Sequence, residues 1–227
     1  MAKKKNAAAA PQETPQAPDA GQQVIEWMEK RRRPLIGALA AVIIIALGTW
    51  SVIANQKRKE IDAARALNEA RVAAQSGNLP LAASDLSRLK ATYRGTLAAD
   101  EATILLAQVR LLQDQPSLAA EELRTALDGG MEDQFQAPAW GLLATALEQM
   151  GSLAEAGRAY ETASRLSWYG YVRAQYLNDA GRAYLDAGDT TSSVAAYQRV
   201  LDEFADSPGA AEASVRLGEL LAAQNAS

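Results

Sequence analysis

A pattern of turn and apolar residues recurs every 37 residues through positions 57–227, and it limits the possible fold more than any other feature of the sequence. The turn position of successive units is occupied by Gly77, Asp114, Gly151 and Gly188. Between these turns the apolar residues recur at helical spacing, and no alternating stretch of useful length indicates a strand. One pair of helices cannot bury its apolar face alone, so a repeat of this kind predicts helix pairs that stack on one another.

Three further positions keep the same 37-residue register. The close-packing position of the first helix holds Ala70, Ala107, Ala144 and Gly181. The small residue five positions after the turn is Ala82, Ala119, Ala156 or Ser193. The larger side chain four positions later is Leu86, Leu123, Tyr160 or Tyr197. Since Leu217, Gly218 and Leu221 open a fifth first helix, the sequence predicts an all-α solenoid of four helix pairs and a capping helix, with an irregular helical bundle as the alternative.

The third unit carries the pattern in its clearest form, over residues 139–163. Its marker residues are Trp140, Leu143, Ala144, Leu147, Gly151, Ala156, Tyr160 and Ala163. Their spacing resembles the tetratricopeptide repeat (TPR), whose motif is W-x2-L-G-x2-Y followed by A-x3-F. The resemblance implies a scaffold with a concave groove lined by the first helix of each pair. The period exceeds the usual repeat of about 34 residues, which either longer helices or longer loops would explain.

Residues 34–56 form a long apolar stretch without a formal charge. At a rise of 1.5 Å per residue, positions 34–54 reach roughly 30 Å, the thickness of the hydrocarbon core of a bilayer. Basic residues bound the stretch on both sides and tryptophans lie near both ends, as at a membrane interface. The predicted interface residues are Trp27, Arg31, Arg32, Arg33, Trp50, Lys57, Arg58 and Lys59. The stretch predicts a single transmembrane helix, and a buried globular helix or a cleaved signal is the alternative.

The residues before this stretch fall into two segments. Residues 1–22 are rich in Ala, Pro and Gln, and positions 6–22 hold no Val, Ile, Leu or aromatic residue, so we expect a disordered tail. Residues 23–33 form a basic juxtamembrane segment. Short basic tails follow the positive-inside rule, whereas long domains cross a membrane largely regardless of charge. We therefore expect a cytoplasmic tail and an extracytoplasmic domain at residues 57–227.

The order of these parts resembles that of the YfgM-like ancillary subunits of the bacterial Sec translocon. Two stretches carry the resemblance locally: residues 93–98, YRGTLA, and residues 140–160. The resemblance implies a single-pass protein of the bacterial inner membrane with a periplasmic domain, whose partners are the translocon and its membrane-bound chaperone. Residues 204–221 also resemble TPR proteins of envelope assembly and division. The alternative function is that of a structural accessory subunit of a larger respiratory or photosynthetic membrane complex.

The composition excludes several kinds of chemistry. The chain contains no Cys and no His, which removes thiol nucleophiles, Ser-His-Asp triads and the usual zinc and haem ligand sets. No phosphate-binding glycine loop, dinucleotide-binding motif or calcium loop is present. Residues 57–227 hold sixteen basic and twenty-three acidic side chains, a net charge of −7, which argues against a nucleic-acid partner. We expect a non-enzymatic protein without catalytic residues, metal ion, cofactor or small-molecule substrate.

Two sets of residues are candidates for binding a protein partner. The first-helix positions that the TPR resemblance assigns to the groove are Arg71, Gln75, Gln108, Leu111, Thr145, Glu148, Gln149, Asn178, Arg182 and Asp186. Exposed charges among them should contribute little to folding. The densest aromatic cluster is Trp168, Tyr169, Tyr171 and Tyr176, at a junction between units. Its first three members are the candidate aromatic surface, and core filling between units is the favoured interpretation of the cluster.

Overall fold

The computed structural model describes residues 21, 24, 25, 27 and 32–225, without the side chains at 32–35, 38, 40, 224 and 225. Apart from residue 21, the predicted tail at 1–22 lies outside the described residues. Arg31 and the side chains of Arg32 and Arg33 also lie outside them. The chain divides into two compact units, Met1–Asn55 and Gln56–Ser227.

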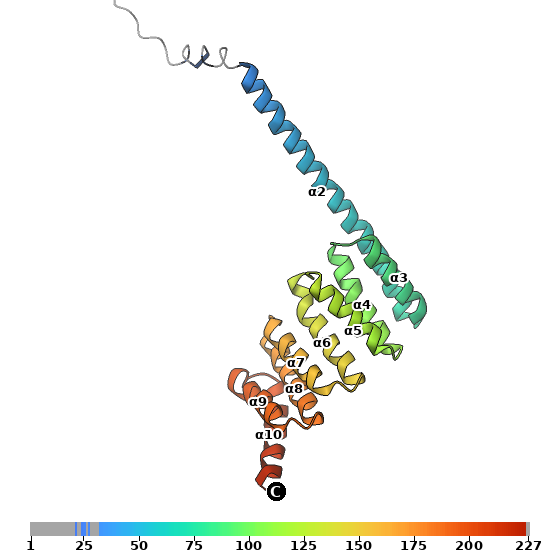
Figure 1. Ribbon diagram of the computed structural model, residues 1–227, viewed down its shortest axis with the longest axis vertical. Coiled ribbons are helices and arrows are strands. Elements are labelled where there is room, and N and C mark those ends of the chain that lie inside the picture. The colour runs from blue at the N-terminus through green and yellow to red at the C-terminus, as the bar shows by residue number, and fades with distance from the viewer. Residues whose placement is uncertain (1–20, 22–23, 26, 28–31, 226–227) are drawn as a thin grey trace, which may run out of the picture. The chain divides into compact units, whose positions relative to one another are not determined.

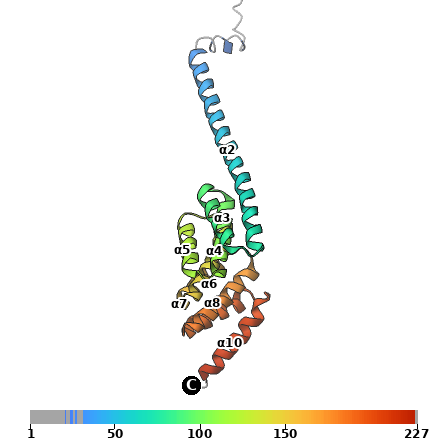
Figure 2. The ribbon, with the colours of Figure 1, turned by 90° about the vertical axis from the view of Figure 1, so that its right-hand side faces the viewer.

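Residues 32–225 are helical apart from turns and short junctions, and this range contains no strand (Figure 1). The helices are α2 (Arg32–Gln75), α3 (Leu79–Thr92), α4 (Leu97–Leu112), α5 (Pro116–Asp128), α6 (Asp133–Gln149), α7 (Leu153–Leu166), α8 (Gly170–Asp186), α9 (Thr190–Glu203) and α10 (Gly209–Asn225). From residue 56 onward the end of α2 pairs with α3, α4 with α5, α6 with α7 and α8 with α9. α10 packs on α8 and α9 as the last helix of the stack (Figure 2). The predicted solenoid of four helix pairs and a capping helix is confirmed for residues 56–225.

The four turns inside the helix pairs share one backbone geometry. The values of φ are 78°, 57°, 77° and 78° at Gly77, Asp114, Gly151 and Gly188. In each turn the N–H of this residue donates to the carbonyl three residues earlier, and the next N–H donates to the carbonyl five residues before it. These two hydrogen bonds form the Schellman motif, which ends a helix on a left-handed residue. The 37-residue register of the sequence is therefore a register of helix ends.

Asp114 has the only positive φ of a residue other than glycine in the described part of the chain. The left-handed conformation strains an L side chain, whereas glycine adopts it freely. We expect Asp114→Gly to stabilise the domain by less than about 1 kcal/mol, because glycine also increases the backbone freedom of the unfolded chain. Gly151→Asp, the reverse exchange one unit later, should destabilise the domain. Thermal melting measures both effects, and a lower melting temperature for Asp114→Gly would contradict the expectation.

Long helices account for the long period of the repeat. The first helices α4, α6 and α8 have 16, 17 and 17 residues, and the second helices α3, α5, α7 and α9 have 13 or 14. The turns within pairs have three residues, and the junctions between pairs have three to five. Connections between packed helices commonly have about 2–8 residues, so these loops are not extended. Of the two explanations that the sequence left open, longer helices apply.

The repeated small residues lie where helices cross. Ala70, Ala107 and Ala144 have no exposed surface, and the same is true of the small residues that follow the turns. In the fourth pair a glycine takes this position, and a Cβ atom at Gly181 of α8 would lie 2.7 Å from Cζ of Tyr197 of α9. Real Cβ atoms do not come so near another heavy atom. The ring of Tyr197 therefore occupies the space that a side chain at Gly181 would need.

The first part of α2 exposes a long run of large apolar side chains. These are Ile36, Leu39, Val42, Ile43, Ile44, Ile45, Leu47, Trp50, Val52 and Ile53. Within the described residues, however, no helix is both long enough and apolar enough to cross a membrane. The transmembrane helix predicted at residues 34–56 is thus not found among them, and the side chains at 34, 35, 38 and 40 are outside the description.

The end of the predicted apolar segment belongs to the second unit. Gln56 Nε2 donates a 3.2 Å hydrogen bond to the carbonyl of Gly95, and Lys59 Nζ donates a 3.4 Å hydrogen bond to the carbonyl of Arg94. Lys57 and Arg58 are exposed. Lys59, which the sequence assigns to a membrane interface, therefore contacts the junction between the first two helix pairs.

Candidate binding surfaces

Three of the predicted groove residues meet where the third helix pair contacts the fourth. Glu148 of α6 accepts a 2.8 Å hydrogen bond from the hydroxyl of Tyr160 and forms a 2.8 Å ion pair with Arg182 of α8. The hydroxyl oxygens of Thr145 and Tyr160 lie 3.2 Å apart, and Arg182 lies 3.5 Å from the carboxylate of Asp179. We call Thr145, Glu148, Tyr160, Asp179 and Arg182 the Glu148 network. Its members contact one another across the two pairs, so the network joins neighbouring repeats.

Burial and charge set the protonation of the Glu148 network. Burial raises the pKa of the Tyr160 hydroxyl, and Glu148 raises it further against the opposing hydrogen bond of Thr145. Tyr160 therefore stays a neutral hydrogen-bond donor. Burial alone would lower the pKa of Arg182, but its hydrogen bond to Glu148 and the charges of Glu148 and Asp179 raise that pKa overall. Arg182 remains a cation between two carboxylates.

Asp179 gives the network a pH dependence. Burial raises the pKa of this carboxyl, and Glu148 and Glu212 raise it further, although Arg182 lowers it. A carboxyl whose pKa is higher in the folded state binds its proton more tightly there, so stability is lost as the pH rises through the unfolded value of about 3.9 toward the folded value. We therefore expect Asp179→Asn to raise the melting temperature at pH 7, with the gain shrinking as the pH falls toward 4.

The matched control for this prediction is Asp186→Asn, on the same helix. Asp186 is exposed and forms no ion pair with another described residue. Melting curves of the two variants between pH 4 and pH 7 make the comparison. If both variants had the same melting temperature as the wild type at pH 7, the ionised carboxylate of Asp179 would not destabilise the folded domain, and the prediction would be wrong.

The remaining groove candidates differ in their surroundings. Arg71 forms an ion pair with Glu101 of α4, and Leu111 packs against the central hydrophobic core. The exposed members, none of which has a side-chain hydrogen bond or ion pair within the described chain, are Gln75, Gln108, Gln149 and Asp186. The groove therefore offers scattered polar side chains and no concentrated binding surface.

Asn178 departs from the groove prediction. Its side chain is 5% exposed, and Nδ2 donates a 2.9 Å hydrogen bond to the carbonyl of Gly209 at the start of α10. A Cβ atom at Gly209 would lie 2.9 Å from the same nitrogen. Because α10 covers this face of α8, Asn178 fixes the capping helix and does not line a groove.

The candidate aromatic surface is exposed, contrary to the favoured interpretation as core filling. Trp168, Tyr169 and Tyr171 are 71%, 60% and 59% exposed at the junction of α7 and α8. The rings of Tyr169 and Tyr171 lie against each other, with centroids 5.8 Å apart. Only Tyr176, the fourth member of the cluster, fills space between pairs. Its ring stacks on that of Tyr160 and takes the place of a side chain at Gly141.

A hollow of about 300 Å³ lies beside this aromatic surface. The residues that line it are Asp133, Gln134, Ala137, Pro138, Leu166, Ser167, Trp168, Tyr169, Tyr171, Val172 and Tyr176. Most of these side chains are apolar or aromatic, and they come from the start of α6, the end of α7 and the start of α8. Pro138 lies inside α6 and has no N–H, so it cannot donate to the carbonyl of Gln134 four residues earlier.

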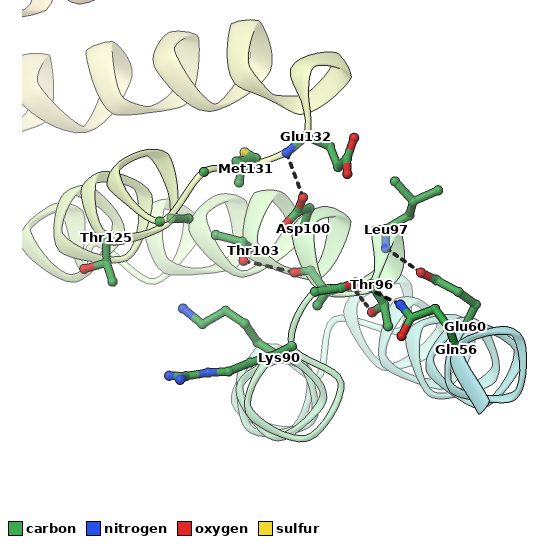
Figure 3. A pocket seen from close by; sticks show the side chains of 16 residues that line it. Gln56, Glu60, Lys90, Thr96, Leu97, Asp100, Thr103, Thr125, Met131 and Glu132 are labelled. Atoms are coloured by element: carbon green, nitrogen blue, oxygen red, sulfur yellow. Dashed lines mark hydrogen bonds between the residues drawn. The ribbon is translucent and has the colours of Figure 1, made fainter. Parts of the chain in front are cut away.

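A second hollow, of about 590 Å³, lies between the junction of the first two helix pairs and the junction of the second and third (Figure 3). Figure 3 shows two of its three acidic side chains turned toward backbone N–H groups: Glu60 accepts from Leu97 at 3.2 Å, and Asp100 accepts from Glu132 at 3.0 Å. Lys90 forms an ion pair with Glu122, and burial, followed by the charge of Arg94, lowers its pKa. These polar groups are mostly engaged with the junctions themselves. No group of three or more possible metal ligands occurs in the described part of the chain.

Comparison with known proteins agrees with this architecture. A family model described as a tetratricopeptide repeat-like domain matches residues 26–220. The chain belongs to the tetratricopeptide repeat-like family. Comparison with curated protein sequences finds no match. The crystal structure of MamA is similar, with a TM-score of 0.55 and 19% identity over 69% of this chain and 84% of that one, and a likeness at this identity shows the fold alone.

Within this TPR-like domain, the groove prediction did not include Tyr160 and Asp179, which contact Glu148 and Arg182 respectively, or Tyr176, whose ring stacks on that of Tyr160. Tyr160 lies on a second helix, whereas the prediction considered first helices alone. Asp179 precedes Arg182 by three residues, a spacing at which opposite charges pair on a helix. Gly141, an isolated glycine inside a helical pattern, indicates the close approach that Tyr176 makes.

Proposed function

We propose that this chain is a non-enzymatic scaffold that binds other proteins, and that the aromatic surface of Trp168, Tyr169 and Tyr171 is its main contact. The observation that carries the proposal is the exposure of these three large side chains beside an apolar hollow. Aromatic residues are enriched at protein interfaces and supply much of the binding energy there. The groove, in contrast, uses its best-placed charges to join repeats.

The test compares two variants with the wild type. The aromatic variant carries both Trp168→Ala and Tyr171→Ala, and the control variant carries Leu112→Ala. Leu112 is 72% exposed in the second helix pair, so its truncation removes a similarly accessible apolar side chain elsewhere. After affinity purification in mild detergent, the Leu112→Ala variant should bring down the same partners as the wild type. The aromatic variant should not bring them down. Melting curves should agree for all three chains, because the truncated side chains are exposed. Equal recovery with the aromatic variant would remove the aromatic surface from the proposal.

We also propose that residues 34–56 anchor the chain in the bacterial inner membrane, with the tail in the cytoplasm and residues 57–227 in the periplasm. The segment carries no charge and has basic flanks, and the family match begins ahead of it, at residue 26. Its described large apolar side chains are exposed, which is unfavourable in water. A reporter fused at Ser227 should be active only in the periplasm. Activity confined to the cytoplasm would contradict the orientation, and a mature chain that starts near residue 55 would contradict the anchor.

The proposed partners are the Sec translocon and its membrane-bound chaperone, and the resemblance to YfgM-like subunits supports this choice. The alternative is a structural accessory subunit of a larger membrane complex. Gly37 and Ala41 favour it, because they are exposed and give α2 a small-xxx-small face suited to packing against another membrane helix. Recovery with translocon components that is sensitive to salt supports the first role. A stoichiometric, cofactor-bearing complex supports the second.

A further inference from the structure

The only formal charge among the residues that line the hollow beside the aromatic surface is negative. Among the residues that line it, Asp133 is the only Asp, Glu, Lys or Arg. The domain around it is also acidic, with a net charge of −7 over residues 57–227. A cationic partner is attracted to such a surface both at a distance and on contact, whereas an acidic one is repelled.

Asp133 is free to take part in this attraction. It is exposed at the first position of α6, and Oδ1 accepts a 3.0 Å hydrogen bond from Nε2 of Gln136. No ion pair joins Asp133 to another residue of the described chain. A carboxylate has acceptor capacity beyond one hydrogen bond, so Asp133 can accept from a partner's guanidinium.

The walls of the hollow match the other parts of an extended peptide. Leu166, Val172 and Ala137 give an apolar wall that suits an aliphatic or proline side chain. Pro138, which has no N–H and so interrupts the hydrogen bonding of α6, adds a further apolar side chain to this wall. The exposed rings of Trp168 and Tyr171 provide flat faces on which a guanidinium can stack.

We propose that the occupant of this hollow is an extended segment of another protein in which an aliphatic side chain stands next to an arginine. The aliphatic side chain enters the hollow, and the guanidinium lies between Trp168 and Asp133. This inference rests on the proposed function, because it names the chemistry of the partner that the aromatic surface binds.

The test measures fluorescence anisotropy of labelled nonapeptides with the full-length chain in mild detergent. The basic apolar probe is GSLRPLRSG, and its matched probes are GSLEPLESG, with glutamate for arginine, and GSSRPSRSG, with serine for leucine. We expect the basic apolar probe to bind most tightly and to bind more weakly as the salt concentration rises. Trp168→Ala should weaken its binding by about tenfold or more, as expected for a central aromatic contact.

Asp133→Asn should weaken the binding of the same probe by about two- to fivefold, as expected for a partly exposed ion pair. Asp202→Asn is the matched control, because Asp202 is also exposed and accepts a 2.9 Å hydrogen bond from a glutamine, Gln198, on its own helix. Its affinity for the probe should equal that of the wild type. Equal effects of the two substitutions would show a general attraction to the acidic domain and overturn the inference.

The outcomes separate this inference from the proposed function. If the glutamate probe binds as tightly as the arginine probe and Trp168→Ala abolishes both, the surface binds proteins but the basic partner is wrong. If no probe binds at millimolar concentration, the inference fails, and the purification experiment still decides the function. If Trp168→Ala binds the basic probe as tightly as the wild type does, both proposals lose the aromatic surface.

Discussion

Replacement of Gly181 by leucine should destabilise the repeat domain by about 1–3 kcal/mol or more, the usual cost of forcing extra volume into a packed core. Even the first added carbon would lie 2.7 Å from Cζ and 2.8 Å from Cε1 and Cε2 of Tyr197. Tyr197 is 1% exposed, so its ring cannot leave without opening the fourth helix pair. Thermal and denaturant unfolding of the full chain measure the loss.

Gly218→Leu is the matched control for this prediction. Gly218 lies 37 residues after Gly181, at the same position of α10, but no heavy atom lies within 4 Å of the Cβ that it would gain. In the described part of the chain, no second helix covers this face of α10. We expect unchanged stability, or a small gain because leucine favours the helical state over glycine. Equal losses at Gly181 and Gly218 would contradict the close crossing.

A compensating exchange tests the physical cause. The second helix pair has Ala107 and Leu123 at the positions that Gly181 and Tyr197 occupy in the fourth. Gly181→Ala should therefore destabilise the domain as a single substitution. In a chain that already carries Tyr197→Leu, the same substitution should lower the free energy of unfolding by less. A double variant whose loss is the sum of the two single losses would show that the ring is not the obstacle.

Helix ends and helix crossings could be predicted from the sequence because they depend on local rules that repeat. A residue with positive φ ends each first helix, and small residues are needed where helix axes approach closely. Both requirements recur at a fixed spacing in the four helix pairs, so the four copies of a pattern that is weak alone support the same prediction. The fold class and the boundaries of the pairs followed from this register.

The surroundings of single side chains could not be predicted in the same way. The register places Asn178 on a helix face, but not the capping helix α10 that covers that face. It places Trp168 at a junction, but the direction of a junction side chain depends on how the next pair is rotated. That rotation leaves Trp168 71% exposed while Tyr176, on the following helix, is half-buried.

Ion pairs between repeats engage three of the ten groove candidates, Arg71, Glu148 and Arg182. Arg71 and Glu101 are 30 residues apart, Lys90 and Glu122 are 32 apart, and Glu148 and Arg182 are 34 apart. None of these separations equals the 37-residue period, so the repeated sequence pattern does not predict these ion pairs. Residues that looked like free groove charges instead hold adjacent pairs together. A charge reversal at one of these residues is therefore expected to change the stability of the domain, whether or not it also changes the binding of a partner.

Arg182→Glu should therefore destabilise the domain by about 1–2 kcal/mol, a buried-pair penalty reduced because the Arg182 side chain is 48% exposed. The new carboxylate would replace a cation that lies 2.8 Å from Glu148 and 3.5 Å from Asp179. Three carboxylates would then share one partly buried site, and the hydrogen bond from Tyr160 alone would not balance them. Urea unfolding at low salt should show the loss clearly, and added salt should reduce it.

Two further variants separate repulsion from the loss of an ion pair. Arg182→Gln removes the cation without adding a negative charge, so it should cost less than Arg182→Glu, and the difference measures the repulsion by Glu148 and Asp179. Arg65→Glu reverses a charge in a pair within one helix, with Asp62 at 3.5 Å and an Arg65 side chain 75% exposed, so we expect a change of less than about 0.5 kcal/mol. A loss for Arg182→Glu no larger than that for Arg65→Glu would show that the Glu148 network does not hold the third and fourth pairs together.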